Sequence, residues 1–169
     1  ICSRLGLAAV LLVIGFVGGN LLQRPSSGQD VQQLTRQVGE LKEMMMLSLL
    51  EKESASERLR AVSLTNEMDK VSDKVTKALF QTLNHDTNVN VRLAALEALT
   101  PYVSQSAVRE ELIRAISMQD SPLVQVTLAE LMASLQEKKS VSALQKLLDN
   151  DNTPKDVKNQ IKKSIDVLI

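Results

Sequence analysis

The stretch HDTNVNVRLAAL at residues 85–96 decides the fold class of this chain. Its first four residues are polar, and Asp, Thr and Asn side chains accept hydrogen bonds from the free amides at the start of a helix. The residues that follow place apolar side chains on one face of a helix, at Val91, Ala95, Leu96 and Leu99. We therefore expect a short turn that opens an amphipathic helix.

The same arrangement recurs at a fixed period. Residues 58–62, 125–129 and 158–162 align with residues 92–96, and the four leading polar residues stand 34, 33 and 33 positions apart. An aspartate lies in the turn before each of the last three segments, at Asp86, Asp120 and Asp151. Such a period indicates stacked units that bury their apolar faces against one another. The sequence predicts an all-α fold, a short α-solenoid of about four helix pairs.

The last segment differs from the others. Its apolar stripe, Val157, Ile161 and Ile165, is narrow, and four lysines occupy its other faces. A terminal repeat needs one packed face and one wet face, so we expect this helix to be an end cap that closes the solenoid. A helix lying on a membrane surface is the alternative interpretation.

Composition excludes several classes of function. All six glycines lie at or before Gly39, whereas phosphate-binding loops, dinucleotide-binding motifs and tight hairpins depend on the positive φ that glycine supplies. Twenty basic residues balance twenty acidic ones, and aromatic residues make up only 2% of the chain. Nucleic-acid binding needs a basic surface or stacking aromatic residues, so we expect no nucleic-acid partner.

An apolar run at residues 5–22 carries no charge and one polar side chain, Asn20. As a helix it would span roughly 27 Å, close to the roughly 30 Å of a bilayer's hydrocarbon core. We expect residues 1–24 to form a transmembrane anchor, with a cleaved signal peptide as the alternative. Gly15 and Gly19 have the spacing that lets two such helices pack closely, which offers one route to a homodimer. Because the chain starts at Ile1 and not at Met, we expect it to be cut from a longer product.

Residues 25–50 are predicted to hold a linker and an amphipathic helix. Apolar residues recur there at spacings of 3, 4, 3 and 4, at Val31, Leu34, Val38, Leu41 and Met45. This 31–45 heptad pattern is typical of a coiled coil, which would give a parallel homodimer. Two heptads are marginal for that, so a helix packed on its own domain is the favoured alternative. The methionine-rich end, residues 44–50, is expected to enter the core of the repeat domain at residues 51–169.

The aligned segments resemble a known family. Asp86, Val91, Arg92, Ala95 and Leu96 are similar to the motif of HEAT repeats, in particular the short repeats of the phycobilisome-lyase type. The other segments depart from it, since Gln125 and Lys158 stand where the motif has arginine.

The layout of anchor, linker and repeats is also similar to bacterial membrane proteins that carry an N-terminal zinc-binding anti-sigma domain. That resemblance implies a single-pass membrane protein with an extracytoplasmic, periplasmic repeat domain. One cysteine and one histidine cannot supply a zinc cluster, so that domain would lie outside this chain.

No residues form a candidate catalytic, cofactor-binding or metal site. His85 is followed by Asp86, but no serine or cysteine stands in the context of a nucleophile, so we expect a solvated turn residue. Arg92 is expected to pair with a turn carboxylate, Asp86 or Asp120, in a neighbouring repeat.

Three hypotheses for function remain. The first is a membrane-tethered scaffold or adaptor that binds a protein partner of unknown identity along the solenoid, with residues 5–22 in the membrane. The alternative is the extracytoplasmic sensor part of an anti-sigma-like regulator whose N-terminal domain is missing. An enzyme, such as a lyase related by repeat type, is disfavoured because it would need a pocket of convergent polar groups; we therefore expect neither catalysis nor a cofactor.

Overall fold

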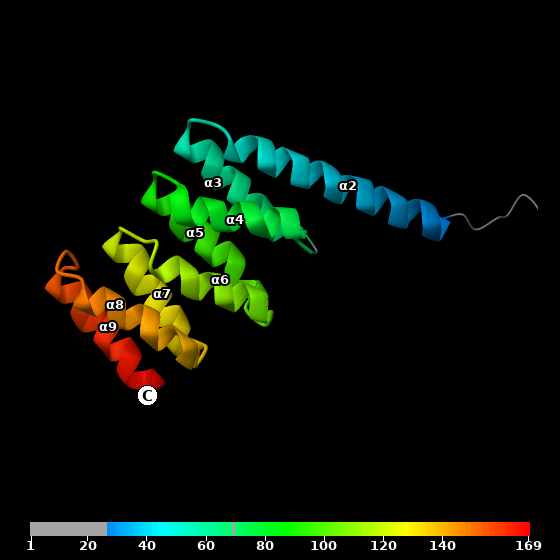
Figure 1. Cartoon of the computed structure of the whole chain (residues 1–169). Coiled ribbons are helices and arrows are strands. Elements are labelled where there is room, and N and C mark those ends of the chain that lie inside the picture. Colours follow the sequence, from blue (N-terminus) through cyan, green and yellow to red (C-terminus); the bar gives the residue numbers. More distant parts are fainter. Residues whose placement is uncertain (1–26, 69) are drawn as a thin grey trace, which may run out of the picture. The chain divides into compact units, whose positions relative to one another are not determined.

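The computed structural model describes residues 27–68 and 70–169, and each element within these ranges is a helix (Figure 1). The predicted anchor at residues 1–24, with Gly15 and Gly19, lies outside them. The elements are α2 (Ser27–Leu50), α3 (Ala55–Ser63), η1 (Leu64–Glu67), α4 (Asp73–His85), α5 (Val89–Leu99), η2 (Thr100–Tyr102), α6 (Ser106–Ile116), α7 (Pro122–Ser134), η3 (Lys138–Ser140), α8 (Val141–Asp149) and α9 (Lys155–Leu168).

Residues 41–169 form one compact unit in which helices stack in two layers. Helix α4 packs on α5, α6 on α7 and α8 on α9, while α3, α5, α7 and α9 follow one another in one layer and α4, α6 and α8 in the other (Figure 1). The four segments aligned by sequence lie in α3, α5, α7 and α9, and the last three of these are the second helices of their pairs. The predicted all-α solenoid is therefore confirmed for the described residues.

Local signals set where the second helices begin. Asn88 precedes α5, and its side-chain oxygen accepts hydrogen bonds from the amides of Asn90, at 2.9 Å, and Val91, at 3.3 Å. Pro122 is the first residue of α7, where its missing amide proton costs nothing. Pro154 lies one residue before α9, which begins at Lys155. The polar turns therefore open helices as the sequence predicts.

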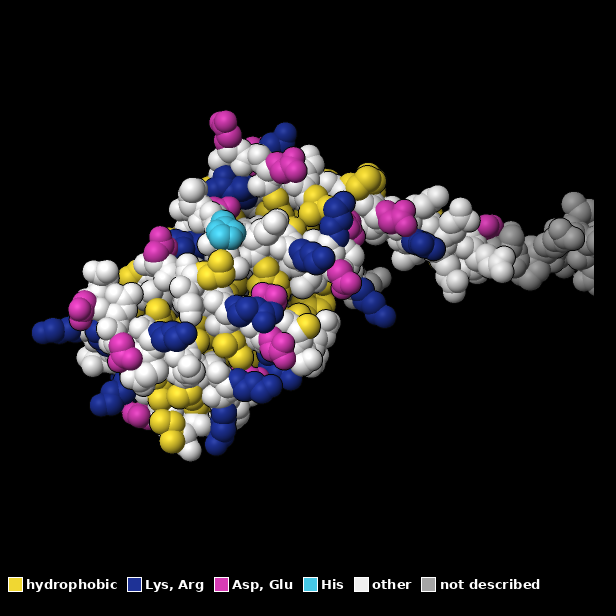
Figure 2. All heavy atoms as spheres, viewed as in Figure 1, with side chains coloured by type: hydrophobic (Ala, Val, Ile, Leu, Met, Phe, Trp, Pro, Cys, Tyr) yellow, Lys and Arg dark blue, Asp and Glu magenta, His cyan; other side chains and the backbone are white. Residues whose placement is uncertain are grey.

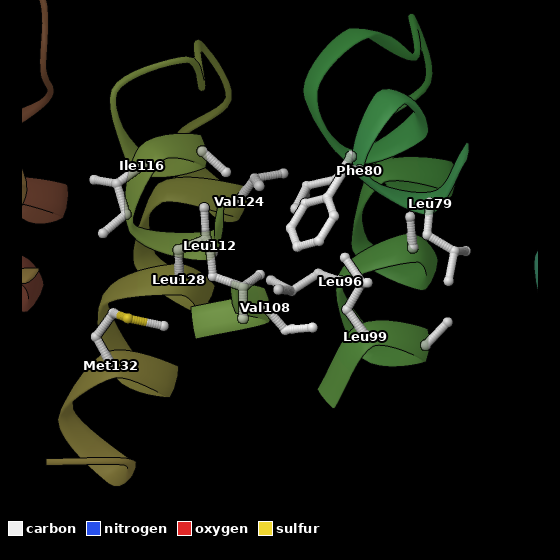
Figure 3. Close-up of a cluster of buried hydrophobic side chains, with 14 of the residues drawn as sticks. Leu79, Phe80, Leu96, Leu99, Val108, Leu112, Ile116, Val124, Leu128 and Met132 are labelled. Carbon is white, nitrogen blue, oxygen red and sulfur yellow. The ribbon is translucent and has the colours of Figure 1, made fainter. Parts of the chain in front are cut away.

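The apolar stripes meet between the two layers. Phe80 of α4 and Leu96 of α5 point toward a second group of side chains from α6 and α7 (Figure 3). Leu79 of α4 and Leu99 of α5 belong to the same buried cluster. The second group comprises Val108, Leu112, Ile116, Val124, Leu128 and Met132. Most of these side chains have no exposed surface, and the contacts between neighbouring pairs make one continuous core, which no single pair could form.

The compact unit begins at Leu41, inside α2 and ahead of the boundary expected near residue 51. Met46 is fully buried, and Leu49 and Leu50 pack against the core, so the methionine-rich end enters the domain as predicted. The heptad residues at this end of α2 do not enter the core of the domain. Leu41 and Met45 are 62% and 43% exposed, so the expectation that the heptad face packs on its own domain is wrong for both. The core accepts the face about one residue further round the helix.

Candidate interaction surface

Charged links join successive repeats at the turns. Arg58 of α3 holds the carboxylate of Asp86 with two hydrogen bonds, from Nε to Oδ2 at 2.7 Å and from Nη2 to Oδ1 at 2.9 Å. The two side chains are only 12% and 6% exposed. Nη1 also donates to the carbonyl oxygens of Lys52 and Glu53, at 3.0 and 2.6 Å. The guanidinium thus ties the turn after α2, helix α3 and the turn after α4 together.

Arg92 makes the equivalent link one repeat later. Its Nη1 donates to Oδ1 of Asp120 at 2.6 Å and to Oε1 of Gln119 at 3.4 Å. The expected pairing of Arg92 with a turn carboxylate is therefore confirmed for Asp120; Asp86 binds Arg58 instead. In both links the carboxylate follows the arginine by 28 residues. We call these two pairs, Arg58–Asp86 and Arg92–Asp120, the rungs.

Gln119 connects three helices at the second rung. Its Nε2 donates to the carbonyl of Leu83 at 3.3 Å and to Oδ1 of Asn84 at 3.2 Å, both in α4. Its own carbonyl accepts a hydrogen bond from Nε2 of Gln125 in α7 at 2.8 Å. Because Gln119 is 5% exposed, these contacts form a buried polar network that fixes how one repeat sits on the next.

The third rung position is neutral. Gln125 occupies the place of Arg92, and Thr153, again 28 residues later, occupies the place of Asp120. Both are 6% exposed. Among the described residues, neither Oε1 of Gln125 nor Oγ1 of Thr153 has a hydrogen-bond partner. The series of charged rungs therefore ends before the last helix pair.

A further charged link lies outside the aligned segments, and the sequence comparison missed it. Arg109 in α6 donates from Nε to Oε2 of Glu137 at 3.0 Å and from Nη1 to the carbonyls of Val103 and Ser104. The partner is once more 28 residues away, and this common offset is the signal that would have found it. Gln136, just before Glu137, has a φ of 52°, a left-handed conformation that ends α7 without a glycine.

Hydrogen bonds shift the titration of several of these groups. The bond from Arg92 lowers the pKa of Asp120 below its ordinary value. The bond with Asp86 raises the pKa of Arg58. Glu111 and Arg114, an exposed pair within α6, shift in the same directions, since their mutual hydrogen bond lowers the pKa of Glu111 and raises the pKa of Arg114. Each shift keeps an ion pair charged and needs no catalytic explanation.

The described residues do not assemble a catalytic constellation. His85 is exposed at the end of α4, as expected for a turn residue (Figure 2). Both oxygens of Asp86 are held by Arg58, so the carboxylate is not free to orient the histidine. Within the same ranges, no group of three His, Cys, Asp or Glu side chains could hold a metal ion.

Two open grooves mark the surface of the compact unit. The first runs between α4 and α6, with a volume of about 520 Å³, and is lined by Asp73, Thr76, Lys77, Phe80, Gln81, Gln105, Ala107, Val108 and Glu111. The second lies between the end of α2 and α4 and includes Leu47, Leu50, Lys74 and Asp86. Charges of both signs alternate with apolar side chains over the repeats (Figure 2), so the visible face has no single-sign patch. Mixed polar and apolar lining is typical of protein-binding surfaces.

By its architecture the protein is a two-layered α-solenoid built from helix-pair repeats. A family model described as HEAT repeats matches residues 76–165, more than half of the chain, so the chain belongs to the HEAT-repeat family. Comparisons with curated proteins and with solved structures give no match. HEAT repeats generally serve protein–protein interaction without catalysis.

The match to the HEAT-repeat family model covers residues 76–165 and does not include the predicted anchor. In the part of the chain that the structure describes, no helix has the length and apolar character needed to cross a bilayer. The apolar run at residues 5–22 lies outside the residues to which that finding applies.

Proposed function

We propose that this protein is a membrane-tethered scaffold or adaptor whose HEAT-repeat surface binds a protein partner. The observation that carries the proposal is the stack of HEAT repeats held in register by the rungs, of which Arg58–Asp86 is buried. A rigid platform of this kind loses little conformational entropy when it binds. The groove between α4 and α6 is the site we favour. Its lining includes the apolar side chain of Phe80 and charges of both signs from Lys77 and Glu111.

Affinity capture with the full chain tests the binding role. Lys77→Glu and Gln81→Arg change exposed groove residues, and the double variant should fold normally while losing the partner that the wild type recovers from native membranes. Lys162→Glu, an exposed change on α9 outside the lining of the groove, is the matched control and should retain the partner. Equal recovery by the wild type and the groove variant would reject this groove, and no partner for any version would reject the scaffold role.

The tether rests on the apolar run at residues 5–22. We expect the full chain to stay with the membrane pellet after alkaline extraction, and a variant with Leu12→Lys and Ile14→Lys to be released. The proposal places the repeat domain outside the cytoplasm. In a Cys2→Ser background, a cysteine at the exposed Ser104 should react with a membrane-impermeant maleimide in intact cells, whereas a cytoplasmic domain would stay unlabelled until lysis.

The sensor part of an anti-sigma-like regulator is the second candidate, favoured by the order of anchor, linker and repeats. A Cys/His zinc cluster encoded upstream of Ile1 would select it, and an upstream sequence without such a cluster would remove it. Self-association belongs to either candidate. The route through Gly15 and Gly19 lies outside the described residues, and the other route is the heptad pattern on α2.

A further inference from the structure

Exposed apolar side chains gather on one helix. Of the ten large hydrophobic residues that are strongly exposed among those described, six lie on α2. These six are Val31, Leu34, Val38, Leu41, Met44 and Met45, with exposed fractions from 43% to 62%. Soluble surfaces seldom keep large apolar side chains together unless another surface covers them.

The domain's own contacts leave this face open. Met46 is fully buried in the core, and it follows Met45 by about 100° around the helix. Lys42 is turned to the same side as Met46, since its Nζ donates to the carbonyl of Glu67 at 3.0 Å and pairs with Oε2 of that residue at 3.2 Å. The end of α2 therefore packs through one face and presents Leu41 and Met45 on another.

The residue types on the open face select the kind of partner. In heptad notation Val31, Val38 and Met45 occupy position a, and Leu34 and Leu41 occupy position d. A β-branched residue at a combined with leucine at d favours two parallel strands over trimers and tetramers. Both valines and both leucines follow that rule, so the pattern fits a second copy of the same helix.

The flanking charges allow the same arrangement. In a parallel pair, position g of one helix faces position e of the other one heptad on, which brings Asp30 to Thr35 and Gln37 to Lys42. Neither pairing opposes like charges. The ion pair between Arg36 and Glu40, at 3.3 Å within one helix, lies on positions f and c, away from the contact. Charge therefore does not prevent two copies from meeting in register.

We propose that α2 joins two copies of this chain in a parallel, in-register coiled coil through residues 31–45. This inference goes beyond the scaffold role and does not depend on what the repeat surface binds. Two heptads bury a small area, and Gly39 lowers helix stability by about 1 kcal/mol. The dimer is accordingly weak and depends on protein concentration, so restriction to a membrane plane would strengthen it.

Disulfide trapping in membranes that contain the full chain tests the geometry. Cys2 is first replaced by serine, and one cysteine is then placed at Leu34, Val38, Met45 or Arg36. In a parallel, in-register pair each seam position meets its own copy, so Leu34→Cys, Val38→Cys and Met45→Cys should form disulfide-linked dimers. Arg36→Cys, on the outer face, is the matched control and should remain monomeric under the same mild oxidation.

Two further variants separate the seam from other routes to a dimer. Leu34→Asp with Leu41→Asp places charge on side chains that are already 61% and 62% exposed, so the fold should persist while the dimer is lost. Gly39→Ala should tighten the dimer by about fivefold or more, since the added Cβ meets open space and stabilises the helix by about 1 kcal/mol. Mass measurements over a range of concentrations in detergent report both effects.

Each outcome bears on the proposal. Trapping at all three seam positions, with loss of the dimer in the aspartate variant, supports it. Trapping at Val38 alone indicates an antiparallel pair and overturns the parallel arrangement. A monomer at every concentration, or a dimer that survives the aspartate variant, overturns the seam as the contact. None of these results depends on finding a partner for the repeats, so failure here is distinct from failure of the scaffold role.

Discussion

Removing the guanidinium of Arg58 should destabilise the repeat domain far more than removing a surface arginine. Arg58→Met keeps the aliphatic stem but breaks both bonds to Asp86 and both bonds to the carbonyls of Lys52 and Glu53. It also leaves a carboxylate that is only 6% exposed without its cation. Breaking a buried pair in this way costs about 3 kcal/mol. For a domain of this size we expect the melting temperature to fall by about 10 °C.

The cycle of Arg58→Met, Asp86→Asn and the double variant isolates the rung. Asparagine keeps an acceptor for the amide of Asn88, which now bonds to Asp86 at 2.8 Å, so the turn is preserved. Because the double variant buries no unpaired charge, we expect it to be more stable than the sum of the single losses implies, by about 1–2 kcal/mol. Thermal and urea unfolding followed by circular dichroism provide the values.

Arg114→Met is the matched control for this cycle. Arg114 also holds a carboxylate, that of Glu111, but the two side chains are 59% and 48% exposed, and exposed pairs contribute little to stability. We expect no measurable change. Equal losses in Arg58→Met and Arg114→Met, or single losses that simply add in the double variant, would refute the argument that burial makes the rung strong.

Three other changes test the remaining features. Gln125→Arg combined with Thr153→Asp should complete the neutral rung and raise the free energy of unfolding by about 1 kcal/mol, while each single change should lower it; urea midpoints measure this. Gln136→Gly should raise it by about 1 kcal/mol, because glycine adopts the left-handed conformation at φ 52° without strain; thermal melting measures this. Because the pKa of Asp120 is lowered from its ordinary value of 3.8, its ion pair adds to the free energy of unfolding at pH values above 3.8. This contribution is lost as the pH falls through the pKa that Asp120 has in the folded protein. Arg92→Met should remove that part of the acid sensitivity in melts between about pH 6 and pH 2.

Each of these three predictions has an outcome that would contradict it. A double variant of Gln125 and Thr153 no more stable than its single parents would mean that the two side chains do not meet. A loss on introducing glycine at position 136 would mean that hydrogen bonding by Gln136, whose Nε2 contacts the carbonyl of Ala133 at 3.1 Å, outweighs the strain. An unchanged acid profile in Arg92→Met would remove the ion pair with Asp120 as the cause.

Much of the architecture was predictable because it depends on local, periodic signals. The 33–34-residue period placed α3, α5, α7 and α9, and the turn chemistry indicated where the last three of these helices begin. The pairing of Arg92 with a turn carboxylate was predictable as well, whereas the choice of Asp120 over Asp86 was not, because the turns supplied both. These inferences needed only the alignment of the chain with itself.

Other features could not be predicted from the sequence because they depend on how the helices of different repeats pack together. The link from Arg109 to Glu137 begins in a first helix, outside the aligned segments. The role of Gln119 arises only when α4, α5 and α7 are brought together. The heptad pattern could not say which face of α2 the core would take, because Met45 and Met46 are equally apolar and only the shape of the core distinguishes them.

The last turns of α2 pack on the core of the repeat domain and also carry the face that we propose contacts a second copy, so self-association should affect the stability of this helix. Met46 anchors them in the core, while Leu41 and Met45 lie on the face that a second copy would cover. A partner that binds only the ordered helix stabilises it by mass action. Self-association would then hold the first repeat closed, and dilution would let it fray before the rest. Hydrogen exchange in α2 and α3 should therefore slow with rising protein concentration, while exchange in α8 and α9 stays constant.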